Sequence, residues 1–317
     1  MLEVKVVKKQ REAEDVFTFE LAPVTGDQLP AFSAGAHIDV FPRDDLCRQY
    51  SLCNRPDERH RYVIAVSREP QSRGGSTAMH DQVLDGRILQ ISEPRNHFQL
   101  HAGVRKSLLF AGGIGITPIL CMAEALQQAG SEFELSYCGR STSRMAFVER
   151  IRNSGFAHRA SIIPDDLSAV EPFDPETAIG SASPDQHLYV CGPPGFMGRV
   201  LDAARRLGWD ESRLHREYFA ASALDHSTDG SFAIELKRSG RTIMVPADQS
   251  AAQALAANGV DLPLSCEQGV CGTCITRVLA GKPDHRDLYF TDEEHARNDF
   301  FTPCCSRSLS ALLVLDL

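Results

Sequence analysis

A chain of 317 residues with 43% hydrophobic and 24% charged residues has an ordinary globular composition, and its length predicts two or three domains. The net charge of -9 argues against nucleic acid as a partner, because the phosphates would be repelled. No apolar run approaches the roughly 20 residues that a membrane-spanning helix needs, and the N-terminus lacks the hydrophobic region of a signal peptide. We therefore expect a cytoplasmic protein without a membrane partner, in which the ten cysteines are thiols or metal ligands rather than disulfides.

Residues 1–103 have the pattern of an antiparallel β-barrel. Short apolar runs at 16–21, 36–40 and 61–66 are separated by turn residues, and one helical stretch at about 76–84 interrupts them. Arg48 to Cys53 places a cation, an aromatic ring and a hydroxyl along one strand, which could bind anionic oxygens and a planar ring. By itself, this run is better explained as an ordinary barrel strand with a surface arginine.

The loop at 72–77, Ser-Arg-Gly-Gly-Ser-Thr, is a stronger candidate for a binding site. Two glycines followed by two hydroxyls at the start of a helix form a nest of backbone N–H groups that suits a terminal phosphate. The alternative is a mobile loop in which a serine caps the helix.

Residues 104–222 alternate strands with helices, which predicts a parallel sheet covered on both faces. A buried strand at 107–111 is followed by the turn Gly112 to Pro118 and a helix to about 128. Further strands are expected at 133–138 and 187–191, and the latter leads into Gly192 and Pro193. Ligands of such sheets bind beyond the carboxyl ends of the strands, where both glycine turns lie. The first turn is not the Gly-x-Gly-x-x-Gly fingerprint, so a tight turn without a ligand is the alternative.

A small, polar linker is expected at 223–230, and a separate domain at 231–317. A hairpin at 232–245 and a helix at 251–258 precede Cys266, Cys271 and Cys274, which have the spacing Cys-x4-Cys-x2-Cys. This is the spacing with which plant-type ferredoxins hold a 2Fe–2S cluster, and Cys304 and Cys305 compete for the fourth position. A zinc site is the alternative, although zinc ribbons usually pair two Cys-x2-Cys motifs. His37, His80, His97 and His101 show no ligand spacing among them, and we assign them no metal.

Taken together, these motifs resemble the phthalate dioxygenase reductase family, and within it the vanillate O-demethylase reductase type, over the whole chain. The resemblance rests on the motifs at 48–52, 73–76, 112–118, 189–193 and 217–219, on the cysteine set, and on the ending at 304–317. It implies an FMN-binding β-barrel at 1–103, an NAD-binding α/β domain at 104–222 and a C-terminal 2Fe–2S ferredoxin domain of the α+β, β-grasp type.

The resemblance also implies roles for individual residues. The residues that would bind flavin are Arg48, Gln49, Tyr50, Ser51, Ala65, Val66 and Ser67, with Arg73, Gly74, Gly75, Ser76 and Thr77 at the FMN phosphate. The residues at the nucleotide turns would be Gly112, Gly113, Gly115, Ile116, Thr117, Cys191, Gly192 and Pro193. Thr117 would lie near the isoalloxazine, Cys191 near the hydride path, and Phe219 over the flavin ring. The cluster ligands would be Cys266, Cys271, Cys274 and Cys304.

The function that follows is transfer of electrons from NADH through FMN and a 2Fe–2S cluster to a partner Rieske-type non-haem iron oxygenase, by a chain expected to be a monomer. FMN is favoured over FAD because the sequence has a phosphate nest and no identifiable adenosine-binding segment. The preference for NADH is weaker, since Arg140 and Arg144 follow the second strand of the nucleotide domain, where a 2′-phosphate would bind. The alternatives are a stand-alone NADH oxidase or reductase for another acceptor, and a non-enzymatic zinc or cluster protein.

Overall fold

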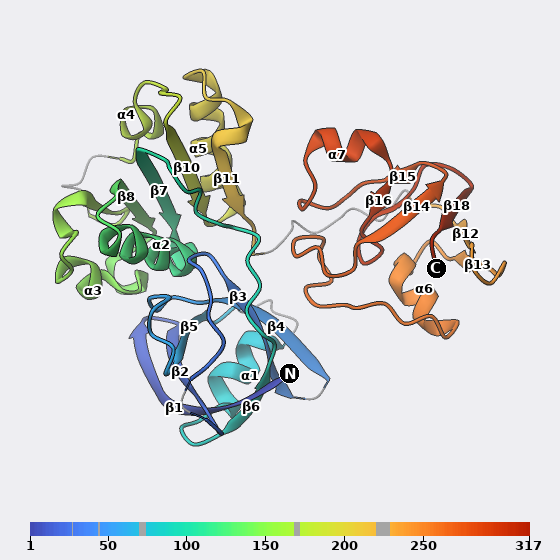
Figure 1. The fold of residues 1–317 in the computed structure, drawn as a ribbon, viewed down its shortest axis with the longest axis horizontal. Coiled ribbons are helices and arrows are strands. Elements are labelled where there is room, and N and C mark those ends of the chain that lie inside the picture. The colour runs from blue at the N-terminus through green and yellow to red at the C-terminus, as the bar shows by residue number, and fades with distance from the viewer. Residues whose placement is uncertain (27, 44, 70–73, 168–171, 220–228) are drawn as a thin grey trace. The chain divides into compact units, whose positions relative to one another are not determined.

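The computed structural model describes residues 1–26, 28–43, 45–69, 74–167, 172–219 and 229–317. The chain forms two compact units, Met1–Glu217 and Tyr218–Leu317. The first unit contains an antiparallel sheet followed by a parallel sheet, and the second contains a mixed sheet (Figure 1). The fold class predicted from the sequence is therefore confirmed. Residues 223–228 of the predicted linker lie outside the described residues.

The antiparallel sheet is a closed barrel. Its elements are β1 (Leu2–Ala13), β2 (Val16–Pro23), β3 (His37–Arg43), β4 (Leu46–Ser51), β5 (Tyr62–Ser67), α1 (Gly75–Gln82) and β6 (Ile88–Ile91). The strands follow the order β4-β3-β6-β1-β2-β5, and a bridge between Leu52 and Ile64 joins the two edges. Alternate apolar residues such as Val4 and Val6 on β1 are fully buried, as expected for strands with one face inside the barrel.

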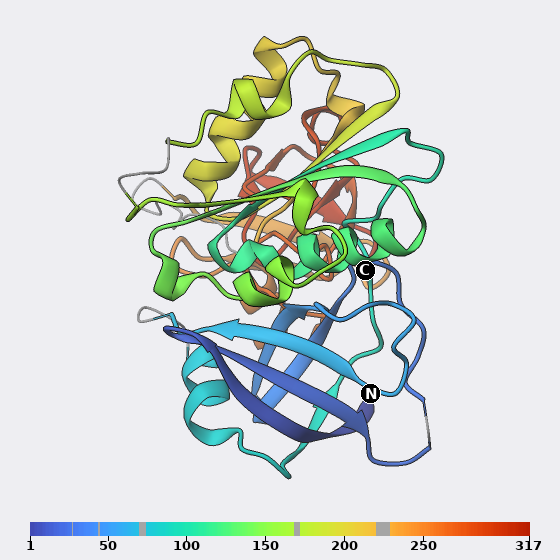
Figure 2. The ribbon, with the colours of Figure 1, turned by 90° about the vertical axis from the view of Figure 1, so that its left-hand side faces the viewer.

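The parallel sheet has its topological switch point between β7 and β10. Its elements are β7 (Lys106–Gly112), α2 (Ile116–Gln128), β8 (Glu132–Gly139), α3 (Val148–Arg152), β9 (Ala160–Pro164), α4 (Pro175–Ile179), β10 (Gln186–Cys191), α5 (Pro194–Arg206) and β11 (Leu214–Glu217). The strand order β11-β10-β7-β8-β9 means that the chain runs outward from β7 in one direction and then from β10 in the other. Figure 2 shows helices on both faces of this sheet. The crevice for a ligand in such a sheet opens where the order reverses, at the carboxyl ends of β7 and β10.

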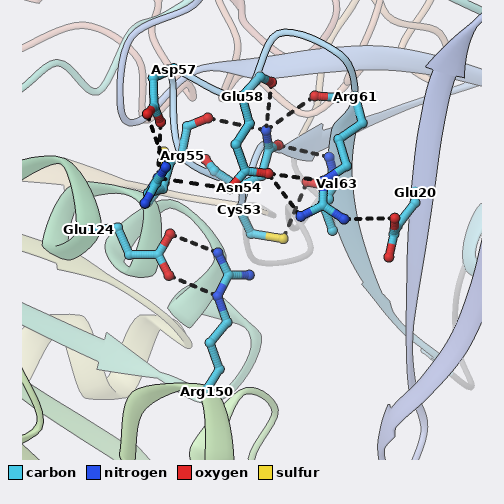
Figure 3. Close-up of polar contacts among 11 residues, drawn as sticks. Glu20, Cys53, Asn54, Arg55, Asp57, Glu58, Arg61, Val63, Glu124 and Arg150 are labelled. Carbon is cyan, nitrogen blue, oxygen red and sulfur yellow. Dashed lines mark hydrogen bonds and ion pairs between the residues drawn. The ribbon is translucent and has the colours of Figure 1, made fainter. Parts of the chain in front are cut away.

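Polar contacts fasten the barrel to the parallel sheet through the turn between β4 and β5, whose own contacts are shown in Figure 3. The buried amide of Asn54 holds the turn between β4 and β5: it donates to the Arg61 carbonyl at 3.2 Å and accepts from the Val63 N–H at 2.8 Å. On α2, the Cys121 thiol donates to the Asn54 carbonyl at 3.1 Å. Gln128, the last residue of the same helix, donates to Asp57 in the turn at 3.1 Å.

The second unit has a five-stranded mixed sheet, and it is the predicted α+β domain. Its elements are β12 (Phe232–Leu236), β13 (Thr242–Val245), α6 (Ala251–Ala257), β14 (Thr276–Ala280), β15 (Pro283–Asp284), α7 (Asp292–Arg297), β16 (Phe300–Phe301), β17 (Arg307–Ser308) and β18 (Leu312–Leu315). β12 and β13 form the expected hairpin, and β18 pairs in parallel with β12.

A buried ion-pair cluster lies where the described part of the second unit resumes after the gap. The carboxylate of Asp229 is fully buried and pairs with Arg286 at 2.6 Å and Arg307 at 3.4 Å. Arg307 also donates to the carbonyls of Gln249 and Pro246. Asp229 is therefore held as part of the folded unit. Among the described residues, no helix is long and apolar enough to cross a bilayer.

Candidate functional site

The two glycine turns of the parallel sheet are pressed against each other at the switch point. A Cβ atom added at Gly115 would lie 2.3 Å from the carbonyl oxygen of Cys191, and one added at Gly192 would lie 2.9 Å from the Cα of Gly112. A Cβ at Gly112 would also lie 2.7 Å from the ring of Phe196. These positions accept only glycine, so the turns predicted from the sequence form one continuous backbone surface at the switch point.

Thr117 lies in the first turn of α2, where it stabilises the first glycine turn. Its side chain is buried, and its hydroxyl donates to the carbonyl of Ile114 at 3.1 Å. α2 itself begins at Ile116, two residues before the predicted start, because Pro118 is tolerated in a first helical turn. Pro193 precedes α5 in the same way at the end of β10. Both helices thus direct their N-termini toward the switch point, which suits a pyrophosphate.

A barrel strand meets the ends of two parallel strands at Ser51, Cys191 and Glu217. Cys191 on β10 pairs with Glu217 on β11, and the hydroxyl of Ser51 at the end of β4 donates to the Glu217 carboxylate at 3.3 Å. Burial raises the pKa of Glu217 to about 8, so this carboxyl group is protonated at pH 7. Burial and the neighbouring Glu217 raise the pKa of Cys191, which keeps its thiol neutral.

Glu217 is the functional candidate that sequence reasoning missed. The residue was part of the 217–219 motif but was given no role. Only the pairing of β10 with β11 indicates its role, because it puts the Glu217 carboxyl group beside Cys191 at the same crevice. Nothing in the sequence near Glu217 indicates that Ser51, more than 150 residues earlier, would contact it.

The side chains of β4 are used in different ways. Arg48 extends toward α1, since a Cβ at Gly75 would lie 2.5 Å from its Nε. The half-buried Tyr50 packs against the barrel core, and burial raises the pKa of its hydroxyl. Gln49 is committed inside the protein, because its amide donates to Asp39 at 3.3 Å and contacts His37.

Arg48 and the start of α1 form a cradle for an anion. Gly74 has a φ of 84°, which turns the backbone into the helix in a conformation that favours glycine. Ser76 is buried and accepts from the Glu69 N–H at 3.1 Å, whereas Thr77 is exposed. An arginine over a glycine at a helix N-terminus fits a phosphate, which is the fit expected for FMN. The predicted contact Arg73 lies outside the described residues.

The remaining predicted flavin contacts lie on β5 and after β11. Ala65 and Val66 are buried, and Ser67 is half-buried at the end of β5. The Val66 carbonyl contacts the ring of His80 on α1 at 2.9 Å, which ties this strand to the helix of the cradle. Phe219 is 41% exposed and belongs to the second unit, so its predicted place over the flavin stays a prediction.

The cysteine loop of the second unit is bent by two glycines in the left-handed region. Gly269 and Gly272 both have a φ of 70°. A Cβ at Gly269 would lie 2.4 Å from the Cys305 sulfur, and one at Gly272 would lie 2.4 Å from the Tyr289 ring. Backbone N–H groups point at the sulfurs, as from Gln268 to Cys266 at 3.3 Å. Such donors stabilise the extra negative charge of a reduced cluster.

Four cysteine thiols gather around this loop. Contacts with the Cys271 and Cys304 thiols lower the pKa of Cys266 to about 2, and contact with the Cys304 thiol lowers the pKa of Cys274. Cys304 therefore lies beside Cys266 and Cys274, whereas Cys305 is buried against Thr302, Ser306 and Cys304 and packs against Gly269. The thiols of Cys266, Cys271, Cys274 and Cys304 form a donor set that fits a 2Fe–2S cluster.

Comparisons with known proteins agree with this arrangement. Residues 234–309 match the 2Fe-2S iron-sulfur cluster binding domain family. The chain is 53% identical to a vanillate O-demethylase oxidoreductase of Pseudomonas putida, with 100% of each chain covered. It is 37% identical to a phthalate dioxygenase reductase of Burkholderia cepacia, with 100% of this chain and 97% of that one covered.

A solved phthalate dioxygenase reductase, described as a modular structure for electron transfer from pyridine nucleotides to [2Fe-2S], superposes on the chain. The TM-score is 0.77 at 37% sequence identity, covering 100% of this chain and 98% of that one. The chain therefore belongs to the phthalate dioxygenase reductase family of electron-transfer oxidoreductases.

Proposed function

We propose that the chain is the reductase component of a Rieske-type non-haem iron oxygenase or O-demethylase system, which takes electrons from NADH and delivers them to the oxygenase. The observation that carries this proposal is the meeting of Ser51, Cys191 and Glu217, because it joins the barrel strand with the anion cradle to the nucleotide crevice. FMN bound at the anion cradle and NADH bound in the nucleotide crevice would have their reactive rings side by side.

The residues of the first unit orient the two carriers. Arg48 and the backbone of Gly74 and Gly75 hold the FMN phosphate, and Tyr50 packs beside the ring. The turns at Gly112 and Gly192 admit the pyrophosphate of NADH by close backbone approach. FMN supplies the conversion from a two-electron donor to a one-electron acceptor. Ser51, Cys191 and Glu217 border the place where nicotinamide and flavin meet, and their neutral side chains leave no fixed charge there.

NADH is the preferred donor in this proposal. The Arg144 guanidinium, which sequence position makes a candidate for a 2′-phosphate, is paired with Glu14 and Asp15 at 3.3 Å each. Pairing with two carboxylates reduces its attraction for a third anion. When the protein is titrated with NADPH in place of NADH and the loss of flavin absorbance is recorded, NADPH should reduce the flavin at least tenfold more weakly.

The second unit carries the electron to the partner. Cys266, Cys271, Cys274 and Cys304 hold the cluster, and the backbone donors of the loop stabilise its reduced form. The net charge of -9 favours a partner that presents a basic surface, since opposite charges steer diffusional encounter.

Reconstitution tests the proposed function. The holoprotein, NADH, oxygen, a purified Rieske oxygenase and a methoxylated aromatic acid are mixed, and NADH loss is compared with product formed. We expect about one product per NADH, and slow NADH loss when the oxygenase is left out. NADH oxidation that is as fast without the oxygenase as with it would instead assign the chain to the stand-alone oxidases.

A further inference from the structure

Three histidines from distant parts of the sequence converge in the first unit. His101 lies in the segment between the barrel and β7, His187 is the second residue of β10, and His215 is the second residue of β11. One ring nitrogen of each lies within 4.8 Å of those of the other two. No local pattern in the sequence indicates this group, because the three positions are 86 and 28 residues apart.

The geometry of the group is close to that of a metal site. The Nδ1 of His187 and the Nε2 of His215 are 2.8 Å apart, and the ring centroids of His101 and His215 are 4.4 Å apart. Three nitrogens bound tetrahedrally to zinc at about 2.0–2.1 Å lie about 3.3 Å from one another. The nitrogens of His187 and His215 are closer than that value, and all three ring nitrogens lie within 4.8 Å of one another, so ring rotations would bring them to one ion. Rotation about the outer torsion of a histidine is soft.

The surroundings keep the rings available as ligands. His187 and His215 are half-buried, and their Nδ1 and Nε2 atoms are hydrogen-bonded to each other, so a bound ion would take the place of that bond. The nearby Arg213 is engaged elsewhere, since it lies 5.0 Å from the Trp209 ring centroid and donates to the Ser183 carbonyl. His101 is exposed, which gives an ion a path from solvent.

The group is separate from the crevice at the switch point. His187, Tyr189 and Cys191 alternate along one face of β10, and at about 3.3 Å per residue His187 lies about 13 Å from Cys191 along the strand. Tyr189 stands between the two places: its ring stacks on His215 at 4.7 Å, and its hydroxyl accepts from the His101 N–H at 2.9 Å.

We propose that His101, His187 and His215 bind one divalent cation of the zinc class, with water as the fourth ligand. Imidazole nitrogen suits zinc, whereas magnesium and calcium prefer oxygen ligands. The ion would fasten the segment that leaves the barrel to β10 and β11. The proposal concerns neither the flavin nor the cluster, and it stands or falls independently of the electron-transfer function.

Metal analysis of the full holoprotein tests the proposal. The protein is dialysed against a buffer in which a chelator sets the free zinc concentration. Zinc and iron are then measured, and the iron content gives the number of chains because each cluster holds two iron atoms. We expect one zinc for every two iron atoms. The melting temperature of the first unit, followed by flavin release, should rise by roughly 5 °C at a zinc concentration one hundred times the dissociation constant.

Single substitutions locate the ion. His101→Ala removes an exposed ligand, and His187→Gln and His215→Gln keep nearly the same side-chain volume in half-buried positions. Each should weaken zinc binding at least tenfold, with unchanged flavin and cluster absorbance. His60→Ala, at an exposed histidine of the β4–β5 turn, should bind zinc like the parent protein.

A second variant guards against zinc binding at another place. His285, Asp287 and His295 in the second unit also lie within 4.8 Å of one another, so His295→Ala is included. Zinc that is lost in His295→Ala and kept in the three variants of the proposed site would overturn the assignment. The absence of zinc from the parent protein at micromolar free zinc would overturn it as well.

Discussion

At the scale of single residues, the protonated Glu217 is the most unusual group in the site. A carboxyl group with a pKa of about 8 is neutral at pH 7 and ionises as the pH rises through that value. Within the described part of the chain its carboxylate accepts a weak bond from Ser51 at 3.3 Å, so ionisation would leave a buried charge with little compensation. The chemistry beside it therefore depends on the proton that Glu217 keeps.

Glu217→Gln tests this dependence. The parent protein should lose NADH–ferricyanide activity as the pH rises through about 8, and the variant should keep a flat profile because glutamine cannot ionise. Stability gives a second readout: between pH 4.5 and 8 the folded chain holds a proton that the unfolded chain releases, so stability falls with rising pH in that window. Urea midpoints at pH 5 and 8 should differ less in the variant. Identical profiles for both proteins would remove Glu217 from the site.

The neighbours Cys304 and Cys305 give a second prediction at this scale. Cys304→Ser should abolish the broad visible absorbance of the cluster, because it removes a thiol that contacts Cys266 and Cys274. Cys305→Ser should keep that absorbance, since the Cys305 thiol contacts Thr302, Ser306 and Cys304 and does not bridge Cys266 and Cys274 as Cys304 does. Iron content and absorbance of the two purified variants provide the measurement, and the reverse pattern would exchange the two assignments.

At the scale of elements, the contact between the two glycine turns fixes the spacing of β7 and β10 at their carboxyl ends. Backbone lies on both sides of this contact, so no side-chain rotation can relieve an added atom. The crevice is thus set by two loops acting together.

Gly115→Ala should separate these turns. The new Cβ would lie 2.3 Å from the Cys191 oxygen, and the turn must shift by about 1 Å to restore a normal contact. Displacements of that size at a reacting centre can cost about 10²-fold, so we expect at least a tenfold loss of kcat/KM for NADH with flavin still bound. Gly198→Ala on α5 is the control, because nothing lies within 4 Å of its added Cβ; it should leave the activity unchanged. Equal activity of the two variants would contradict the argument.

The elements were largely predictable from the sequence, and the contacts between them were not. Period-two patterns and glycine turns located the hairpin β12–β13 and the strands β7, β8 and β10 of the parallel sheet, because these signals are local, whereas β9 and β11 were not predicted. The bond from Ser51 to Glu217 depends on how the barrel packs against the sheet, and the contacts of Gln49 with Asp39 and His37 depend on the pairing of β3 with β4. The choice between Cys304 and Cys305 was open for the same reason. The two cysteines were expected on a strand, but they lie in the turn between β16 and β17, and only the folded unit shows which thiol contacts Cys266 and Cys274.

At the scale of the whole molecule, the chain divides after Glu217, and a buried ion-pair cluster holds the start of the second unit's described part after the gap. In the second unit this is the buried Asp229 with Arg286 and Arg307. Removing one partner of a buried ion pair leaves the others uncompensated, at a cost of about 3–5 kcal/mol.

Asp229→Ala should therefore destabilise the second unit by about 3 kcal/mol, while the first unit melts as before. Asp316→Ala is the matched control: its partner Arg238 is 71% exposed, and exposed pairs contribute less than about 1 kcal/mol. Urea unfolding followed at the cluster absorbance for the second unit, and at the flavin for the first, measures both. A similar loss in the two variants would show that the Asp229 cluster is no stronger than a surface pair.

Because Asp229 is anchored in the second unit, the chain between Glu217 and Asp229 limits how far these two residues can separate. Twelve peptide links join Glu217 to Asp229, and they cannot span more than about 40 Å in any conformation. A unit held on a tether of this length experiences its neighbour at an effective concentration in the millimolar range. Dilution of the protein leaves that effective concentration unchanged, so the rate constant for electron transfer between the two units should not depend on protein concentration. The rate of electron delivery to the partner should instead rise with the concentration of the partner.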